Sequence, residues 1–297
     1  MKTKMHFISG LPRSGSTLLA GLLRQNPRFH AAMTGPVGPL FAAIHNTMGA
    51  QNETSVFIDE DMRKKLLTSL FETYYEPQGD CDVIFDTNRV WCSRLPTLDA
   101  LFPESKVICC VRDVGWIMDS IECLVRKNAF EPSKLFATPE ERATVFSRVE
   151  ALAHRDRMVG FAWSALKEAY YGMHSDRLLL VEYDILCRQP KDVMNLIYEF
   201  LDEPAFSHDF DNVDYSEETF DAQLATKGLH DVRRKVEFRP RASILPPDLF
   251  ARYESLDFWR DPAGSSAYRI VSKQTPGGAK NDVSDLDQPD SESIAAE

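Results

Sequence analysis

The chain has 297 residues, of which 43% are hydrophobic and 27% charged, and its net charge at pH 7 is −11. This composition is typical of a globular protein with a sizeable core and excludes a wholly disordered or fibrous chain. The acidic balance disfavours nucleic-acid or anionic-membrane partners, because both require a broad basic surface. We therefore expect no nucleic-acid partner, although a local pocket of arginines would still bind an anion. No stretch approaches ~20 consecutive apolar residues, so we expect no membrane span.

The first ten residues and the cysteines both favour a cytoplasmic protein. Residues 1–10 are partly basic but lack the apolar core and small-residue cleavage site of a secretory signal. Six cysteines form no Cys-x-x-Cys pair and no Cys/His cluster with zinc spacing. We expect them to be reduced core residues, and we expect no metal site.

Short apolar runs alternate with longer amphipathic segments along the chain. The apolar runs predict strands at residues 5–9, 83–85, 106–111 and 177–182. The amphipathic segments predict helices at about residues 16–25, 59–75, 93–101, 115–127, 139–171 and 190–201. Wholly apolar strands separated by helices indicate buried parallel strands joined by right-handed crossovers. The sequence therefore predicts an α/β fold around a central parallel sheet.

The helix predicted at residues 139–171 has the clearest start of all. Thr138 is a suitable N-cap, Pro139 suits the first helical position, and Glu140 and Glu141 lie in the first turn. A helix of this length offers enough surface for a homodimer, which we keep as an expectation.

The chain changes character after residue 202. A polar loop is followed by a basic segment at residues 230–241 and a last helix near residues 247–256. Residues 273–297 carry two basic and six acidic side chains and no apolar period, which predicts an acidic, disordered tail. We expect a single domain over residues 1–272.

The segment from Phe7 to Leu19 carries the most informative motif. Gly10, Gly15 and Thr17 occupy the corresponding positions of the phosphate-binding pattern G-x-x-x-x-G-K-[ST]. Ser16 stands where that pattern has lysine, and Arg13 is the one cation of the loop. A strand, a small-residue loop and a helix in this order direct backbone N–H groups at one point, which favours an anion site over a plain turn.

A second motif follows at residues 106–113, where an apolar strand ends at Arg112 and the next helix carries Ser120. Arginine offers a bidentate fork to phosphate, and the hydroxyl adds a donor where the helix dipole favours anions. The alternatives are that Arg112 pairs with Asp113 or a helix end and that Ser120 is a spacer. Both motifs follow parallel strands, whose carboxyl ends are where open α/β sheets bind ligands.

Together the two motifs resemble those of sulfotransferases, which use 3′-phosphoadenosine 5′-phosphosulfate (PAPS) as donor. Leu11–Leu19 resembles their 5′-phosphosulfate loop, and Arg112 with Ser120 resembles their 3′-phosphate site. Residues 84–91, 101–106 and 180–184 extend the likeness to bacterial and tyrosylprotein-type members.

The resemblance implies a three-layer α/β fold like that of P-loop nucleoside kinases. It also implies PAPS as co-substrate with no metal required, Arg13 as the cation that stabilises the leaving group, and Tyr183 beside the adenine. Arg233, in the late basic segment, would close over the adenosine 3′-phosphate; the alternative is that this segment is a solvated basic loop. The loop residues that would supply N–H and hydroxyl donors are Ser14, Gly15, Ser16, Thr17 and Leu18.

The proton acceptor is where the sequence departs from the family. Residues 34–38 contain no carboxylate where the tyrosylprotein type has a glutamate, and Thr87 and Asn88 stand where a lysine is often found. Asp86 is the candidate general base, or alternatively a structural carboxylate that orients Arg89 or Arg13. Three further candidates are histidines, each of which also suits a surface or structural role, namely His30, His45 and His230.

Two other functions and the acceptor stay open at this point. A P-loop kinase acting on a small molecule is disfavoured by Ser16, since phosphoryl transfer from ATP normally uses the lysine. A PAPS-binding protein without catalysis is the other alternative. Residues 36–48 and the helix at 59–75 either line the acceptor pocket or belong to the core, and the sequence does not identify the acceptor.

Overall fold

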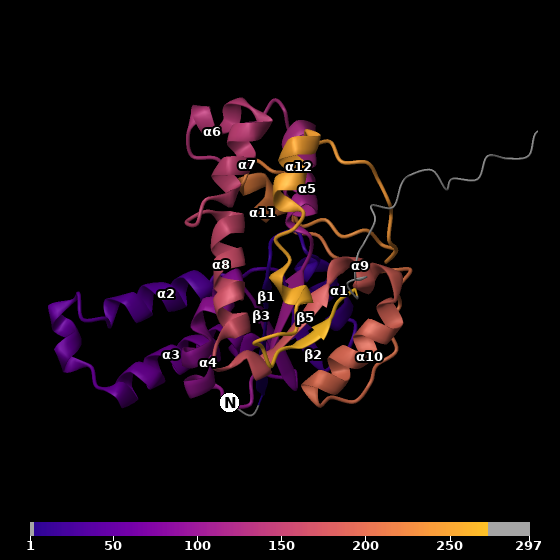
Figure 1. The fold of residues 1–297 in the computed structure, drawn as a ribbon. Coiled ribbons are helices and arrows are strands. Elements are labelled where there is room, and N and C mark those ends of the chain that lie inside the picture. Colours follow the sequence, from indigo (N-terminus) through magenta and orange to yellow (C-terminus); the bar gives the residue numbers. More distant parts are fainter. Residues whose placement is uncertain (1–2, 273–297) are drawn as a thin grey trace, which may run out of the picture.

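The computed structural model describes residues 3–272, so the acidic tail predicted for residues 273–297 lies outside the described residues. The centre of the fold is a parallel six-stranded sheet (Figure 1). In spatial order the strands are β2 (Phe29–Ala31), β3 (Val83–Thr87), β1 (Lys4–Gly10), β4 (Val107–Val111), β5 (Leu178–Glu182) and β6 (Tyr268–Ile270). The parallel sheet is confirmed, whereas the extent of the domain stays a prediction.

The two strands that the sequence did not predict, β2 and β6, lie at the edges of the sheet. Each has three residues, which is too short for a hydrophobic pattern to distinguish a strand from a loop. They form because β3 and β5 offer unpaired backbone groups at the edges of the four predicted strands.

Helices cover both faces of the sheet and give the three-layer architecture expected from the resemblance. Strand residues alternate between the layers, so Phe7 packs into one buried cluster and Ile8 into the other. One layer holds α1 (Ser16–Leu23), α9 (Tyr183–Arg188) and α10 (Pro190–Leu201). The other holds α2 (Val37–Thr47), α3 (Glu60–Tyr75), α4 (Leu95–Leu101), α5 (Val114–Lys127), α8 (Met158–Tyr171) and α12 (Pro247–Tyr253). Short 3-10 turns lie at Glu53–Phe57, Glu76–Gln78, Arg89–Arg94, Ser175–Arg177 and Phe258–Arg260.

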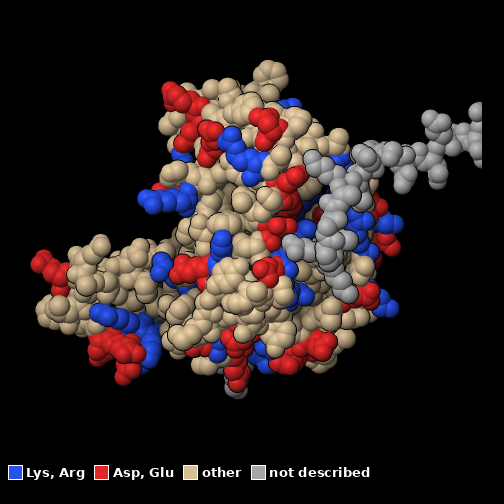
Figure 2. Space-filling view, viewed as in Figure 1, with Lys and Arg blue, Asp and Glu red and all other residues tan. Residues whose placement is uncertain are grey.

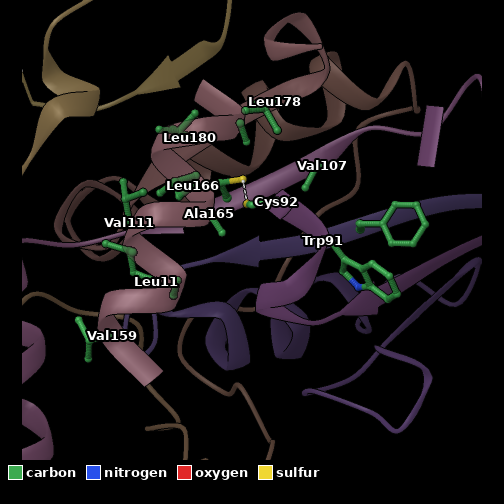
Figure 3. Close-up of a cluster of buried hydrophobic side chains, with 14 of the residues drawn as sticks. Leu11, Trp91, Cys92, Val107, Val111, Val159, Ala165, Leu166, Leu178 and Leu180 are labelled. Atoms are coloured by element: carbon green, nitrogen blue, oxygen red, sulfur yellow. Dashed lines mark hydrogen bonds between the residues drawn. The ribbon is translucent and has the colours of Figure 1, made fainter. Parts of the chain in front are cut away.

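The core beside α8 contains both large rings and thiols (Figure 3). The ring of Trp91 lies 5.2 Å from that of Phe7 and 5.8 Å from that of Phe71, centroid to centroid. The sulfurs of Cys92 and Cys109 are 3.5 Å apart, and all six cysteines are free thiols. Four of them are buried, as expected for core residues, whereas Cys81 and Cys123 are only partly buried.

The single helix predicted over residues 139–171 is wrong, because three helices occupy that range. They are α6 (Pro139–Ala143), α7 (Val145–Ala153) and α8. Thr138 caps α6 as predicted, but Thr144 and Ser147 form a reciprocal capping box that starts a new helix. At Gly160 a Cβ would lie 2.3 Å from the carbonyl oxygen of Ala153, so α8 packs closely against the end of α7. The surface on which a homodimer was expected is thus not one continuous helix, and a homodimer stays an untested prediction.

Helices α2 and α3 extend from the sheet as an arm (Figure 1). Phe41 and Phe71 are fully buried where the arm joins the core, while Phe57 in the connection at its far end is 86% exposed. Of the residues considered for an acceptor pocket, Phe41, Met48 and Phe71 are therefore core, the alternative that the sequence had left open.

The surface mixes both signs of charge. On the face drawn in Figure 2, acidic and basic side chains lie in small interspersed groups rather than one broad basic area. Within residues 3–272, none of the helices has the length and apolar character needed to cross a bilayer.

Candidate functional site

The loop between β1 and α1 is fixed to the neighbouring strand by glycine. Gly10 has a φ of 100°, and a Cβ there would lie 2.2 Å from the carbonyl oxygen of Cys110 in β4. The backbone N–H of Leu11 donates to that same oxygen at 2.9 Å. Arg13 also has a positive φ, 57°, which turns the loop toward the start of α1. Only glycine fits at position 10, so the loop leaves the sheet at a defined place.

The start of α1 is open toward the loop. Its N-cap, Gly15, contributes no side-chain hydrogen bond, and the first turn carries no acidic residue. The first N–H groups of a helix have no partner within the helix and carry its positive end. Backbone donors around Ser16 and Thr17 are therefore available to an anion.

Arg13 joins the two motifs that the sequence kept 107 positions apart. Its Nε donates to the hydroxyl of Ser120 in α5 at 3.2 Å, and its terminal nitrogen donates to the backbone carbonyl of Leu229. Burial and the nearby positive charge of Arg112 lower the pKa of Arg13. Lowering it from such a high ordinary value leaves a charged guanidinium that has few solvent contacts.

Arg112, at the end of β4, lies against Tyr183 at the start of α9. Its guanidinium carbon is 4.6 Å from the ring centroid, and its Nε is 4.0 Å from a carboxylate oxygen of Asp184. The Nε is buried and makes no hydrogen bond. Burial raises the pKa of Tyr183 to about 12, so its phenol stays neutral. The ring of Tyr183 also lies against Gly15, where a Cβ would approach it to 2.7 Å.

A cavity of about 470 Å³ lies between these groups. That volume is within the ordinary range for small-molecule sites. Ser14 is the one predicted loop residue that does not line the cavity, because its buried hydroxyl donates to the carbonyl of Pro12 at 3.3 Å. The predicted donor-site residues that do line it are Arg13, Gly15, Ser16, Thr17, Leu18, Arg112, Ser120, Tyr183 and Arg233.

The position of Asp86 corrects the sequence prediction. Its side chain is buried in the core, where it accepts hydrogen bonds from Tyr75 Oη at 2.6 Å and Trp91 Nε1 at 2.7 Å. Both carboxylate oxygens are thus engaged, and Asp86 does not line the cavity. Burial raises its pKa to about 6, and its partners are neither Arg89 nor Arg13. The structure therefore gives no support to Asp86 as a base, because a base must reach the proton that it removes.

Arg89 is a cavity residue whose role the sequence did not settle. It follows β3 and lines both the main cavity and a small adjoining one of about 30 Å³. Within residues 3–272 no ion pair or hydrogen bond joins its side chain to another group, and burial lowers its pKa. Thr87 lines the small cavity too, with a buried hydroxyl that has no partner.

The late segment, residues 229–241, forms the opposite wall of the cavity, and most of its residues line it. Buried carboxylates hold both of its ends. Asp221, in α11 (Glu218–Gln223), accepts the backbone N–H of His230 at 2.9 Å. Asp119, in α5, pairs with Arg241 and accepts the backbone N–H of Ile244 at 2.7 Å. The basic run in the sequence indicated this wall, but neither anchoring carboxylate carried any pattern that marks it.

Comparison with known proteins agrees with the geometry. The model of the sulfotransferase family matches residues 6–208, which is more than half of the chain. No curated protein matches at a significant level.

Solved structures with a similar arrangement include three sulfotransferases. A sulfotransferase domain from the curacin biosynthetic pathway is 16% identical, with 86% of this chain and 92% of that one covered and a TM-score of 0.48. A domain from the Synechococcus PCC 7002 olefin synthase is 18% identical, with 86% and 89% covered and a TM-score of 0.43. A sulfotransferase of Mycobacterium avium is 16% identical, with 70% and 66% covered and a TM-score of 0.41. Likenesses this distant carry nothing further, so membership rests on the matched family model: the chain belongs to the sulfotransferase family.

Proposed function

We propose that the protein transfers a sulfuryl group from PAPS to a hydroxyl or amine of an acceptor still to be identified. The observation that carries the proposal is the hydrogen bond of 3.2 Å between Arg13 and Ser120 inside one cavity. It means that the loop after β1 and the middle of α5, where Ser120 lies, are close enough for one nucleotide to reach both. PAPS carries an anionic group at each of these two ends, one on the 5′ and one on the 3′ position.

The charge of the cavity supports a ligand with several negative charges. Within residues 3–272, Arg13, Arg89 and Arg233 have no carboxylate partner, and Arg112 has only Asp184 at 4.0 Å. PAPS carries about four negative charges near neutral pH, two of them on the 3′-phosphate. Arg13, Arg89 and Arg112 are largely buried in this acidic protein, which is costly without such a ligand, because cations taken out of water need compensation.

Each residue then has a defined role in the proposal. Arg13 and the N–H groups at the start of α1 stabilise the charge that develops on the departing 5′-phosphate, as donors fixed in advance. Arg112 and Ser120 bind the 3′-phosphate, and Tyr183 lies beside the adenine. Holding the sulfuryl group in line with the acceptor oxygen supplies much of the rate, since positioning replaces a bimolecular encounter.

Arg89 takes, in this proposal, the place of the lysine that the resemblance leads one to expect after this strand. It follows β3, which lies on the opposite side of β1 from β4 and Arg112, and it lines the small cavity together with Thr34 and Thr87, whose hydroxyl has no partner. A guanidinium there would bind oxygens of the transferred group. An unpaired arginine at the edge of two connected cavities fits that task better than a structural ion pair.

The test of the donor compares two nucleotides by calorimetry. We expect the product 3′-phosphoadenosine 5′-phosphate (PAP) to bind with a Kd at least about 100-fold lower than that of ATP with magnesium, a difference of roughly 2.7 kcal/mol. Tighter binding of ATP would instead indicate a kinase-like site and contradict the proposal.

The test of the activity follows a ³⁵S-labelled sulfuryl group. PAPS labelled on sulfur is incubated with the protein and a panel of phenols, alcohols and amines, and labelled products are separated by chromatography. We expect label on at least one acceptor or released to water. Tight PAP binding with no PAP formed from PAPS would identify a binding protein without catalysis.

A further inference from the structure

A histidine and a buried carboxylate form a pair at the wall of the cavity. His230 Nδ1 lies 2.6 Å from one oxygen of Asp221, and the backbone N–H of His230 donates to the other oxygen at 2.9 Å. The side chain of Asp221 is 1% exposed and that of His230 is 15% exposed. The ring of Phe220 packs on the imidazole at 5.3 Å between centroids. Two hydrogen bonds and one ring contact thus fix the orientation of His230.

This arrangement determines which ring nitrogen is free. An ionised carboxylate only accepts hydrogen bonds, so Nδ1 of His230 carries the hydrogen that lies toward Asp221. In the neutral imidazole Nε2 is then an acceptor. Nε2 has no partner among the described residues, and His230 lines the cavity. An acceptor nitrogen held by a buried carboxylate is what proton removal from a substrate requires.

The pair lies next to the proposed leaving-group cation. The carbonyl of Leu229, one residue before His230, accepts a hydrogen bond from Arg13. The imidazole and the guanidinium therefore line neighbouring parts of one cavity, although the two residues are 217 positions apart in the sequence. A ligand group bound next to Arg13 therefore also lies near His230.

The other cavity residues that accept protons are less suitable. Glu237 is paired with Arg239. Burial raises the pKa of Tyr183 to about 12 and raises that of Cys187, so both stay protonated at neutral pH. Asp231 lines the cavity but is exposed, and among the described residues no side chain pairs with its carboxylate. His230 is the cavity base whose orientation the structure fixes.

We propose that His230 Nε2 is the general base of the transfer and that Asp221 is the residue that positions it; this inference rests on the proposed function. The acceptor O–H bond breaks and its proton goes to Nε2, while the acceptor oxygen forms a bond to sulfur. The bond between sulfur and the 5′-phosphate oxygen breaks, and PAP leaves with the electron pair. The imidazolium then returns the proton to solvent, so the balance is PAPS and an alcohol giving PAP, a sulfate ester and H⁺.

The experiment uses water as the acceptor, which removes the need to know the natural one. The probe is PAPS alone, and the rate of PAP formation is measured for the full chain together with PAP affinity by calorimetry. We expect His230→Gln to lower kcat by roughly 100-fold or more, the usual contribution of a general base, with PAP affinity within about threefold of the wild type. Adding imidazole should restore part of the activity of His230→Ala.

Asp221→Asn tests the positioning role without removing the side chain. Its amide oxygen still accepts the backbone N–H of His230, but its N–H₂ donates to Nδ1, which leaves the hydrogen on Nε2. We expect a loss of kcat similar to that of His230→Gln, an unchanged melting temperature and no rescue by imidazole. His154→Gln is the matched control, because His154 and Asp156 form an exposed pair at 3.8 Å outside the cavity.

Each result has a defined meaning. Failure of the wild type to bind PAP, or binding without any PAP formed from PAPS, overturns the proposed function itself and the inference with it. A wild-type rate in His230→Gln also overturns the inference and leaves the function standing. Loss of PAP affinity in that variant would make His230 a donor ligand instead, and loss of kcat in Asp231→Asn alone would move the base to Asp231.

Discussion

The two walls of the cavity are built in different ways. The loop after β1 and the residues after β4 emerge from central parallel strands, where the backbone is fixed on both sides by the sheet. The late segment, residues 229–241, has no strand of its own, and side chains of Asp221 and Asp119 hold its ends. Groups that must meet the donor in a fixed geometry thus come from the sheet. The wall that must admit the donor is held by its two anchored ends and by separate backbone hydrogen bonds to residues 210–215.

This difference explains what the present contacts of Arg13 imply. In the described structure its guanidinium is shared between Ser120 on the sheet side and the Leu229 carbonyl on the late segment. An incoming 5′-phosphosulfate competes for those same N–H groups. Donor binding is therefore expected to separate Arg13 from Leu229 while the sheet side stays in place.

The largest expected effect is a loss of kcat on removing Arg13 from the sheet-side wall of the cavity. Arg13→Ala should lower kcat for transfer from PAPS by about 100- to 1000-fold, the cost of losing one preorganised donor at the developing charge. Arg155→Ala, which removes an exposed arginine, is the matched control. Turnover within a few-fold of the wild type in Arg13→Ala would contradict the role assigned to the loop.

The next effect is a change in stability with pH at Asp86, which distinguishes a structural role of this carboxylate from a catalytic one. Burial raises its pKa to about 6, against an ordinary value near 4. The folded protein binds this proton more tightly than the unfolded chain, so the contribution is full below about pH 4 and is lost as the pH rises through 6.

The change corresponds to about 3 kcal/mol of unfolding free energy. Urea unfolding at pH 4 and pH 7 should therefore show the wild type losing that much relative to Asp86→Asn, with PAP affinity unchanged in the variant. The exposed aspartate variant Asp80→Asn should follow the wild type. A folded Asp86→Asn protein that binds PAP but does not turn over would return Asp86 to the chemistry.

A smaller effect concerns the 3′-phosphate. Arg112→Ala should weaken PAP binding by roughly 10- to 100-fold, since a hydrogen bond to a charged group contributes about 1.5–3 kcal/mol. Affinity for adenosine 5′-phosphate, which lacks the 3′-phosphate, should change little. Equal losses for the two nucleotides, measured by calorimetry, would place Arg112 elsewhere on the ligand.

The smallest effect is on the late segment. Arg233 is an exposed side chain at the cavity wall, so Arg233→Ala should weaken PAP binding by only about two- to fivefold, and less in high salt. Arg234→Ala, the adjacent exposed arginine that does not line the cavity, is the control. A loss in Arg233→Ala as large as that in Arg112→Ala would mean that the two walls hold the donor equally firmly.

The difference between the two cavity walls also explains which site residues could be predicted from the sequence. Gly10, Arg13, Arg112 and Ser120 follow strands whose apolar runs mark them, and parallel topology brings strand ends together. The broken helix at residues 139–171 was hidden because Thr144 and Ser147 cap a new helix without interrupting the apolar period. Local residue types favoured continuity, and the close approach of Gly160 in α8 to the end of α7 depends on tertiary packing.

The carboxylates could not be assigned from sequence, because their roles depend on distant partners. Asp86 is adjacent to the site in the chain, yet Tyr75 and Trp91 hold it in the core. Asp221 lies in a polar segment without any motif, yet folding buries it behind His230. A carboxylate in a sequence has many available partners, and only the fold selects among them.

The central claim is that one adenine nucleotide contacts both anion sites at once. Calorimetry on the wild-type chain with PAP, adenosine 5′-phosphate and adenosine 3′-phosphate tests it most directly. We expect one PAP bound per chain, with a Kd at least about tenfold lower than that of either monophosphate, or 1.4 kcal/mol. An affinity for PAP no greater than that for adenosine 5′-phosphate, or two PAP molecules bound per chain, would contradict it.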